Sequence, residues 1–192
     1  MQSKKIAITG GIGSGKTVLC DMLRAMGYTV LSCDETSHAL WQEREYRAEL
    51  ARLFPSCVRN GEIDKSLLSA LVFNDEAARK RLENFSHPRI FERLTSDMVG
   101  GKIVFCEVPL LFEGGYERLF DGVVLLLRQE EERIRSVQVR DGLTEAQIRA
   151  RMGAQLDVQA VKDKDVFIIE NNGSVQDLRI KAEELLRHFD IK

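Results

Sequence analysis

Eight residues near the start of the chain, Gly10 to Thr17, constrain the rest of it most strongly. They read GGIGSGKT, which fits the pattern glycine, four residues, glycine, lysine, serine or threonine. An apolar run precedes them and a helix-like run follows, which is the order of a P-loop. In such a loop, glycines let backbone N–H groups and a helix N-terminus surround a phosphate. The sequence therefore predicts a nucleoside triphosphate site.

The loop also assigns roles to its last residues. Lys16 is expected to reach the β- and γ-phosphates, and the Thr17 hydroxyl is expected to ligate Mg²⁺. The loop alone does not name a reaction, because kinases, GTPases and motors share it. The nucleotide-binding residues that we expect here are Gly11, Ile12, Gly13, Ser14, Gly15, Lys16, Thr17 and Val18.

Composition excludes several classes of protein. The 192 residues suffice for one core with an inserted lid. Lys and Arg (28) nearly balance Asp and Glu (30), so we expect no nucleic-acid partner. The longest apolar run, Val123 to Leu127, is too short to cross a bilayer, so we expect no membrane partner. Four scattered cysteines favour reduced, mostly buried thiols and a cytoplasmic location.

Short apolar runs separated by helical patterns indicate an α/β fold. Three of the runs are almost uninterrupted, as expected of strands covered on both faces. We expect a five-stranded parallel sheet wrapped by helices, with the ligand beyond the carboxyl ends of the strands. The predicted strands are Lys4 to Thr9, Tyr28 to Cys33, Lys102 to Glu107, Gly122 to Leu127 and Val166 to Ile169.

Two stretches interrupt this alternation. Between residues 34 and 101 no strand is expected; helices are predicted around 35–53, 66–72 and 75–85, with another beginning at Pro88. Between residues 129 and 163 arginines recur, and Thr144 with Gln147 can form a capping box for a second helix. A charged helical hairpin here is typical of a mobile lid. For most of these arginines the alternative, a solvated helix face, is favoured.

Four further residues are candidates for chemistry. Asp34 follows the second predicted strand, where it can accept a proton from a substrate hydroxyl or cap the next helix, and both interpretations stay open. Glu107 closes the third strand, in a position suited to the metal's outer shell. Arg140 is a candidate for neutralising the transferring group. His87 is favoured as a binding or structural residue over a general base.

These features together resemble the dephospho-coenzyme A kinases, and the resemblance runs nearly end to end. A P-loop alone is generic, whereas its combination with HPRI and PLLFE in this order is highly specific. The segments that carry the resemblance are ITGGIGSGKT (8–17), CDETSHAL (33–40), GEIDKSLLSALVF (61–73), HPRI (87–90), VPLLFE (108–113), RDGLT (140–144), RMGAQ (151–155) and IIENNGS (168–174).

The resemblance implies phosphorylation by ATP of the ribose 3′-hydroxyl of dephospho-coenzyme A, the last step of coenzyme A biosynthesis. It implies a single P-loop kinase domain over residues 1–192, with a helical coenzyme A-binding insert at about 35–100 and a lid at about 129–163. The family roles that it carries over are Asp34 as the base, Arg140 as the lid arginine, His87 holding the acceptor, Leu111, Phe112 and Glu113 lining the acceptor side, and Asn171 and Gly173 near the adenine.

Some positions depart from the family pattern, and two other functions stay open. Lys65 and His38 stand where arginine is usual, and Lys65 lacks the forked geometry of a guanidinium. The first alternative is another small-molecule kinase, such as a nucleoside monophosphate kinase. The second is a nucleotide-dependent switch ATPase, although no Asn-Lys-x-Asp guanine motif is present. Nothing in the sequence fixes the oligomeric state, and a monomer is favoured.

Overall fold

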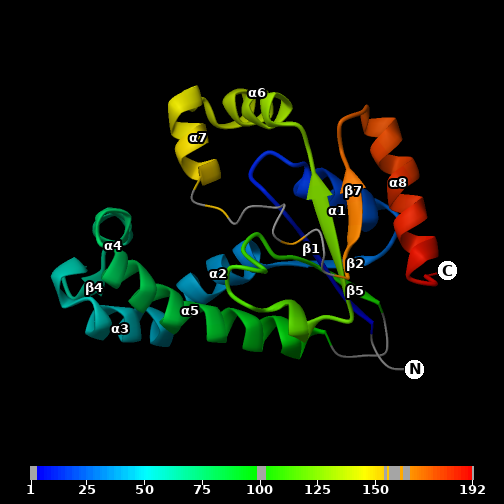
Figure 1. The fold of residues 1–192 in the computed structure, drawn as a ribbon. Coiled ribbons are helices and arrows are strands. Elements are labelled where there is room, and N and C mark those ends of the chain that lie inside the picture. The colour runs from blue at the N-terminus through cyan, green and yellow to red at the C-terminus, as the bar shows by residue number, and fades with distance from the viewer. Residues whose placement is uncertain (1–3, 99–102, 154, 156–160, 162–164, 192) are drawn as a thin grey trace. The chain divides into compact units, whose positions relative to one another are not determined.

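The computed structural model describes residues 4–98, 103–153, 155, 161 and 165–191. The chain divides into two compact units, each with its own set of contacts. The first unit comprises Met1–Ser32 and Met98–Lys192, and the second comprises Cys33–Asp97. Figure 1 shows the sheet elements in the first unit and the helices α2 to α5 in the second.

The first unit is built on a five-stranded sheet in the order β2-β5-β1-β6-β7, and all neighbouring strands run parallel. The predicted α/β fold is therefore confirmed, and every strand lies within two residues of its predicted run. Residue 102, the predicted start of the third run, lies outside the described residues. The strands are β1 (Lys5–Gly10), β2 (Thr29–Ser32), β5 (Val104–Glu107), β6 (Gly122–Leu127) and β7 (Phe167–Glu170).

The core of this unit forms where two helices pack on the sheet. Helix α1 (Lys16–Ala25) follows β1, and α8 (Val175–His188) follows β7 and lies beside it in Figure 1. Leu19 of α1 and Leu178 of α8 are almost fully buried in one cluster with apolar side chains of the strands. Because parallel strands end at the same edge, the segments after β1, β5 and β7 meet there. This edge positions the candidate site.

Residues 130–153 form a helical hairpin, as the sequence predicted. Helices α6 (Glu130–Asp141) and α7 (Glu145–Gly153) meet at Gly142, whose φ of 66° is left-handed. The predicted capping box is confirmed: the Thr144 N–H donates to Gln147 Oε1 at 3.0 Å, and the Gln147 N–H donates to Thr144 Oγ1 at 3.4 Å. We call α6 and α7 the lid hairpin. Residues 154, 156–160, 162 and 163 of the predicted lid lie outside the described residues.

The second unit is mainly helical, with its own buried core around Leu50, Leu68 and Leu94. Within the described parts of both units, every helix is too short or too polar to span a bilayer. The elements of the second unit are α2 (Cys33–Gln42), α3 (Arg44–Leu53), η1 (Pro55–Cys57), β3 (Val58–Arg59), β4 (Glu62–Ile63), α4 (Lys65–Asn74) and α5 (Glu76–Asp97). A short turn, η2 (Glu117–Leu119), belongs to the first unit.

Helix α5 contradicts one prediction. It runs unbroken from Glu76 to Asp97 with Pro88 inside it, so the prediction of a helix beginning at Pro88 was wrong. Proline lacks an N–H and cannot donate to the carbonyl four residues earlier. Phe85 and Ile90 are buried on either side of the proline, so packing outweighs the local penalty. Arg89 Nη1 also donates to the Phe85 carbonyl oxygen at 2.9 Å, one residue after the Asn84 carbonyl that Pro88 leaves without its helical donor.

The prediction that residues 34–101 contain no strand was also wrong. Strands β3 and β4 form a small antiparallel hairpin with Val58 opposite Ile63. Asn60 and Gly61 connect the strands, and both have positive φ, 51° and 82°. An Asn-Gly pair is the preferred connection for a two-residue hairpin because both residues tolerate this conformation. The dipeptide therefore predicts a hairpin turn. The hairpin was missed because the strands on either side of it are only two residues long.

Candidate functional site

The glycine loop joins the end of β1 to the start of α1, and two of its glycines are required by shape. Gly13 and Gly15 have φ values of 77° and 97°. A Cβ atom on Gly15 would lie 2.3 Å from Asn171 Nδ2, and one on Gly13 would lie 2.7 Å from the Arg133 carbonyl oxygen. No larger residue fits either position without displacing its neighbours. The loop is thus closely enclosed by segments that lie far away in the sequence.

Lys16, the first residue of α1, turns its side chain back over the loop. Its Nζ donates to the Gly10 carbonyl oxygen at 2.7 Å and to the Gly11 carbonyl oxygen at 3.2 Å. The loop is tightened further by the Ser14 N–H, which donates to Gly11 O at 3.2 Å. A cation and a helix N-terminus therefore occupy the same edge of the sheet. This is the arrangement that favours a phosphate group.

Asn171, which follows β7, braces the loop from the other side. Its side chain is 9% exposed, and its Nδ2 donates to the Ser14 carbonyl oxygen at 2.9 Å. Its own N–H donates to the Leu127 carbonyl oxygen at 2.7 Å. Gly173 lies close beside the capping box of α8, where a Cβ atom would be 2.5 Å from an Asp177 carboxylate oxygen. The predicted contacts of Asn171 and Gly173 with adenine stay predictions.

Oxygen atoms suited to Mg²⁺ meet at the start of α1. The Thr17 hydroxyl donates to Glu107 Oε1 at 3.2 Å, so the predicted metal ligand and the acid that closes β5 are in contact. Hard oxygen donors of this kind fit Mg²⁺, which is held mainly by one or two protein groups and by substrate phosphates. Among the described residues, no cluster of three His, Cys, Asp or Glu side chains could hold a metal by itself. The chain's residues therefore fit a magnesium ion that is shared with a nucleotide.

Glu107 also lies beside a buried thiol. Burial of Cys20, together with the negative charge of Glu107, raises the pKa of its thiol to about 12. The thiol therefore stays protonated at neutral pH. Among the described residues no cysteine forms a disulfide: Cys20, Cys57 and Cys106 are buried, as the sequence predicted, and Cys33 is partly exposed.

The loop's Ile12 peptide is held on both sides by residues that sequence reasoning did not select. Gln155 Oε1 accepts from the Ile12 N–H at 2.8 Å, and Arg133 Nε donates to the Ile12 carbonyl oxygen at 2.8 Å. We call this pair of contacts the Ile12 clasp. The Ile12 side chain also packs against the apolar cluster of the lid hairpin. The sequence separations, 143 and 121 residues, left no local signal for either contact.

The arginine that the sequence favoured, Arg140, lies elsewhere in the lid hairpin. Its Nε and Nη2 atoms donate to the two carboxylate oxygens of Asp141 at 2.7 and 2.8 Å. This bidentate pair lowers the pKa of the Asp141 carboxyl and raises that of the guanidinium. The Arg140 side chain is 59% exposed. Its predicted contact with the transferring phosphate stays a prediction.

The segment after β5 forms a pocket with the glycine loop. Phe112 and Glu113, two of the predicted acceptor residues, line it, and Leu111 is fully buried beneath the segment. The predicted contact of Leu111 with the acceptor stays a prediction. The other residues that line the pocket are Thr9, Gly10, Gly11, Pro109, Leu125, Gln155 and Val161.

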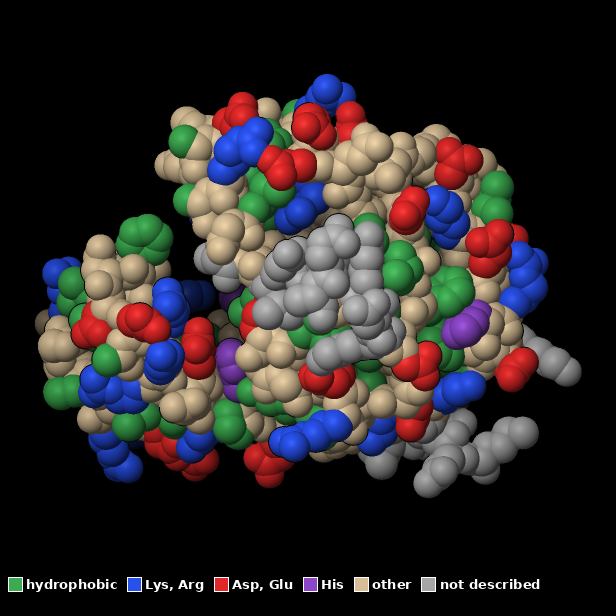
Figure 2. Space-filling model, in the orientation of Figure 1, with side chains coloured by type: hydrophobic (Ala, Val, Ile, Leu, Met, Phe, Trp, Pro, Cys, Tyr) green, Lys and Arg blue, Asp and Glu red, His purple; other side chains and the backbone are tan. Residues whose placement is uncertain are grey.

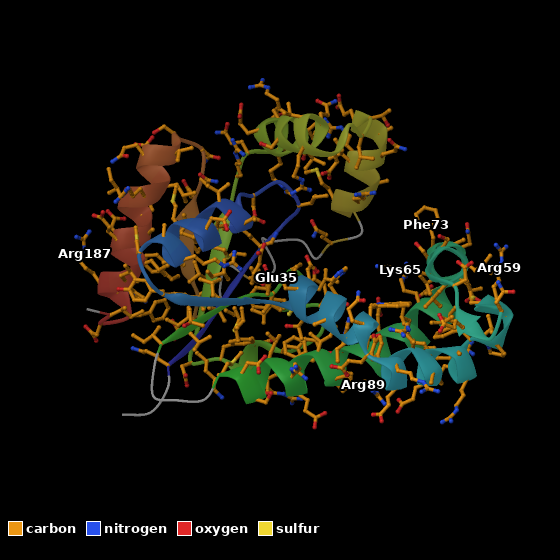
Figure 3. All side chains as sticks on the ribbon, turned by 180° about the vertical axis from the view of Figure 1, so that it is seen from behind. Glu35, Arg59, Lys65, Phe73, Arg89 and Arg187 are labelled. Atoms are coloured by element: carbon orange, nitrogen blue, oxygen red, sulfur yellow. The ribbon has the colours of Figure 1, made fainter. Side chains whose placement is uncertain are left out.

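The second unit carries most of the remaining predicted residues. Asp34 is exposed in the first turn of α2, two residues after β2 ends. His87 is half-buried within α5, and burial lowers its pKa while the charge of Glu83 opposes the change. Lys65, one of the departures from the family pattern, begins α4 and places its Nζ 5.4 Å from the ring centre of Trp41 (Figure 3). Val18 is exposed on α1 in the first unit.

Comparison with known proteins gives consistent results. A sequence profile of the family described as dephospho-CoA kinase matches residues 4–177. A dephospho-CoA kinase of Thermus thermophilus is 38% identical over 183 residues, which covers 94% of this chain and 89% of the relative.

Solved structures agree. A crystal structure from Thermus thermophilus matches with a TM-score of 0.86 at 36% identity, and it covers 98% of both chains. The dephospho-CoA kinase from Campylobacter jejuni matches with a TM-score of 0.73 at 28% identity, again over 98% of both chains.

Proposed function

Since the chain belongs to the dephospho-CoA kinase family, we propose that it transfers the γ-phosphate of ATP to the ribose 3′-hydroxyl of dephospho-CoA. Membership makes the protein an ATP-dependent phosphotransferase that catalyses the last step of CoA biosynthesis. The observation that carries the proposal is the match of the family profile over residues 4–177, which spans both units.

The reaction needs an acceptor oxygen, a leaving group and a destination for one proton. The 3′-oxygen forms a bond to the γ-phosphorus while the bond from that phosphorus to the β–γ bridging oxygen breaks, and ADP leaves with the electron pair. Asp34 takes the proton of the attacking hydroxyl. Its place in the first turn after β2, with its carboxylate exposed, supports this role.

The phosphate loop holds the donor. Backbone N–H groups of the loop and the N-terminus of α1 bind the phosphates, and Lys16 moves from the Gly10 and Gly11 carbonyls to the β- and γ-phosphate oxygens. Mg²⁺, when bound, would neutralise phosphate charge, and Thr17 would hold it with Glu107 as the supporting acid. The contact between these two side chains supports the assignment.

The acceptor side is assigned by the same reasoning. Phe112 and Glu113 lie beside the loop glycines Gly10 and Gly11, and this proximity supports a role in holding dephospho-CoA near the γ-phosphate. We also assign Leu111, whose side chain is fully buried, to the acceptor side. His87, in an insert of residues 35–100 that would bind CoA, helps to hold the acceptor. Arg140 and the lid of residues 129–163 close over the phosphates, and Asn171 and Gly173 lie near the adenine.

The partners follow from the reaction. We propose dephospho-CoA and ATP as the small-molecule partners and a monomer as the working form. Cys20, Cys57 and Cys106 are buried and form no disulfide among the described residues, which supports a reducing, cytoplasmic compartment.

Purified protein with ATP, Mg²⁺ and a panel of acceptors tests the proposal. Dephospho-CoA should drive ADP release, and the product should carry its new phosphate on the 3′-oxygen. Nucleoside monophosphates, gluconate and shikimate should not. A preference for a nucleoside monophosphate would replace the proposal with a different kinase, and rapid ATP turnover without any acceptor would replace it with a switch ATPase.

A further inference from the structure

The arginines of the lid hairpin differ in how their charges are balanced. Figure 2 shows acidic and basic side chains interleaved over α6 and α7. Four arginines form ion pairs there: Arg128 and Arg135 with Glu132, Arg140 with Asp141, and Arg149 with Glu130 and Glu145. Two of these arginines, Arg135 and Arg140, lie with Arg133 on α6, whereas Arg128 precedes that helix and Arg149 lies on α7. Among the described residues, no carboxylate lies within ion-pairing distance of the Arg133 guanidinium.

Arg133 instead points at the phosphate loop. Its Nε donates to the Ile12 carbonyl oxygen at 2.8 Å, and its Nη2 lies 2.3 Å from where a Cβ atom of Gly11 would be. The side chain is half-buried, and burial lowers its pKa against the opposing effect of Glu130. A guanidinium remains charged under these conditions. A carbonyl accepts its hydrogen bond but does not neutralise that charge.

The loop therefore holds two cations on three consecutive carbonyl groups. Lys16 donates to the carbonyls of Gly10 and Gly11, and Arg133 donates to that of Ile12. The carbonyl contacts of both are weak compared with charge-assisted bonds to phosphate oxygens. An anion that enters the loop would draw both side chains toward it.

We propose that Arg133 binds the γ-phosphate of ATP and neutralises charge on the transferring phosphoryl group. The proposal rests on the proposed placement of the triphosphate in the loop. Gly11 leaves open the space over which the guanidinium lies, because any side chain there would collide with it. The planar fork of the guanidinium suits two phosphate oxygens at once. Arg140, by contrast, already has a bidentate carboxylate partner.

A purely structural role is the competing explanation. Arg133 and Gln155 form the Ile12 clasp, so Arg133 could serve only to shape the loop. The two roles predict different nucleotide selectivity. A misshapen loop would weaken ADP and ATP alike, because both place a β-phosphate in it. Loss of a γ-phosphate contact would weaken ATP alone.

The test compares Arg133→Gln with Arg135→Gln. Arg135 lies on the same helix, is 71% exposed and pairs with Glu132, so it is a matched control. Calorimetric binding of ATP, ADP and a non-hydrolysable ATP analogue is measured with Mg²⁺, together with steady-state kinetics. We expect Arg133→Gln to weaken ATP about tenfold or more relative to ADP and to lower kcat about a hundredfold. Arg133→Lys should restore part of the ATP preference, and Arg135→Gln should match the wild type.

Equal weakening of ATP and ADP in Arg133→Gln, or no change in either, overturns the proposal. Should that variant not fold, Arg133→Met is measured in its place, because methionine retains much of the aliphatic stem. Failure of both to fold means that Arg133 is needed for the fold and also overturns the proposal. The proposed function is judged separately, since it fails only if the wild type does not phosphorylate dephospho-CoA.

Discussion

The two units differ in how far along the chain their defining contacts reach. In the first unit, the loop is held by Asn171 to Ser14 and by Gln155 to Ile12, which join residues 157 and 143 positions apart. In the second, the buried Tyr46–Ser86 bond and the Arg89–Glu49 pair each join residues 40 positions apart. The phosphate loop is thus assembled by long-range closure of a parallel sheet. In the second unit the candidate residues Asp34 and His87 lie on helices, and contacts within this unit join residues that are closer in sequence.

The largest effect that sharpens this contrast comes from Lys16→Ala in the first unit. Removing the cation should lower turnover about a thousandfold, because a charge directed at the phosphates is lost from a preorganised site. The free energy of unfolding should stay within about 1 kcal/mol of the wild type, since the sheet and α1 hold the loop without it. Steady-state kinetics and urea unfolding measure both quantities.

Lys80→Ala is the matched control for Lys16→Ala. Lys80 pairs with Glu76 on an exposed face of α5, and its loss should change turnover less than twofold. A Lys16→Ala variant that has lost most of its stability would show instead that Lys16 holds the loop together. In that case the claim that the sheet and α1 hold the loop without Lys16 would be wrong.

The same contrast explains what the sequence could predict. The strands and the loop were readable because each is a short, local pattern: an apolar run, or glycines before Lys16 and Thr17. The Ile12 clasp was not, because no local pattern marks Arg133 as different from Arg135 on the same helix. Only the tertiary fold distinguishes Arg133, which contacts the phosphate loop, from Arg135, which pairs with Glu132.

In the second unit the failures have a different cause. Pro88 was predicted to begin a helix from a rule that considers only neighbouring residues, and burial of Phe85 and Ile90 overrides that rule. The hairpin at Asn60 and Gly61 had a clear turn signal, but its two-residue strands lack the alternation that identifies strands.

Asp34→Asn gives the next largest effect and tests whether the second unit contributes to the chemistry. Turnover should fall about a hundredfold, because the amide cannot accept the proton of the attacking hydroxyl. The affinity for ATP should stay nearly unchanged, since the phosphate loop belongs to the first unit. Kinetics with dephospho-CoA and calorimetry with ATP give the two numbers.

Glu35→Gln separates this role from simple stabilisation of a helix. Asp34 and Glu35, of which Glu35 is labelled in Figure 3, are both exposed acids in the first turn of α2. Each favours that helix end by about 0.3–1 kcal/mol. Neutralising either acid should therefore lower stability, and only Asp34→Asn should lower turnover. Similar turnover in the two variants would return Asp34 to a role in helix stability alone.

The smallest effect is expected for Pro88→Ala. This variant tests the packing that keeps a proline inside α5, against the rule that proline begins a helix. A proline inside a helix lowers the free energy of unfolding by about 3 kcal/mol. Because it also restricts the unfolded chain, it raises that free energy by roughly 0.4–1 kcal/mol. The variant should therefore raise the free energy of unfolding by about 2 kcal/mol, measured with urea. Pro55→Ala is the matched control, because Pro55 occupies the first position of η1, where proline fits. It should lower stability by about 0.4–1 kcal/mol, opposite in sign. If Pro88→Ala also destabilises the protein, the neighbouring side chains pack around a helix shaped by the proline, and the second unit depends on that residue as closely as the first depends on its glycines.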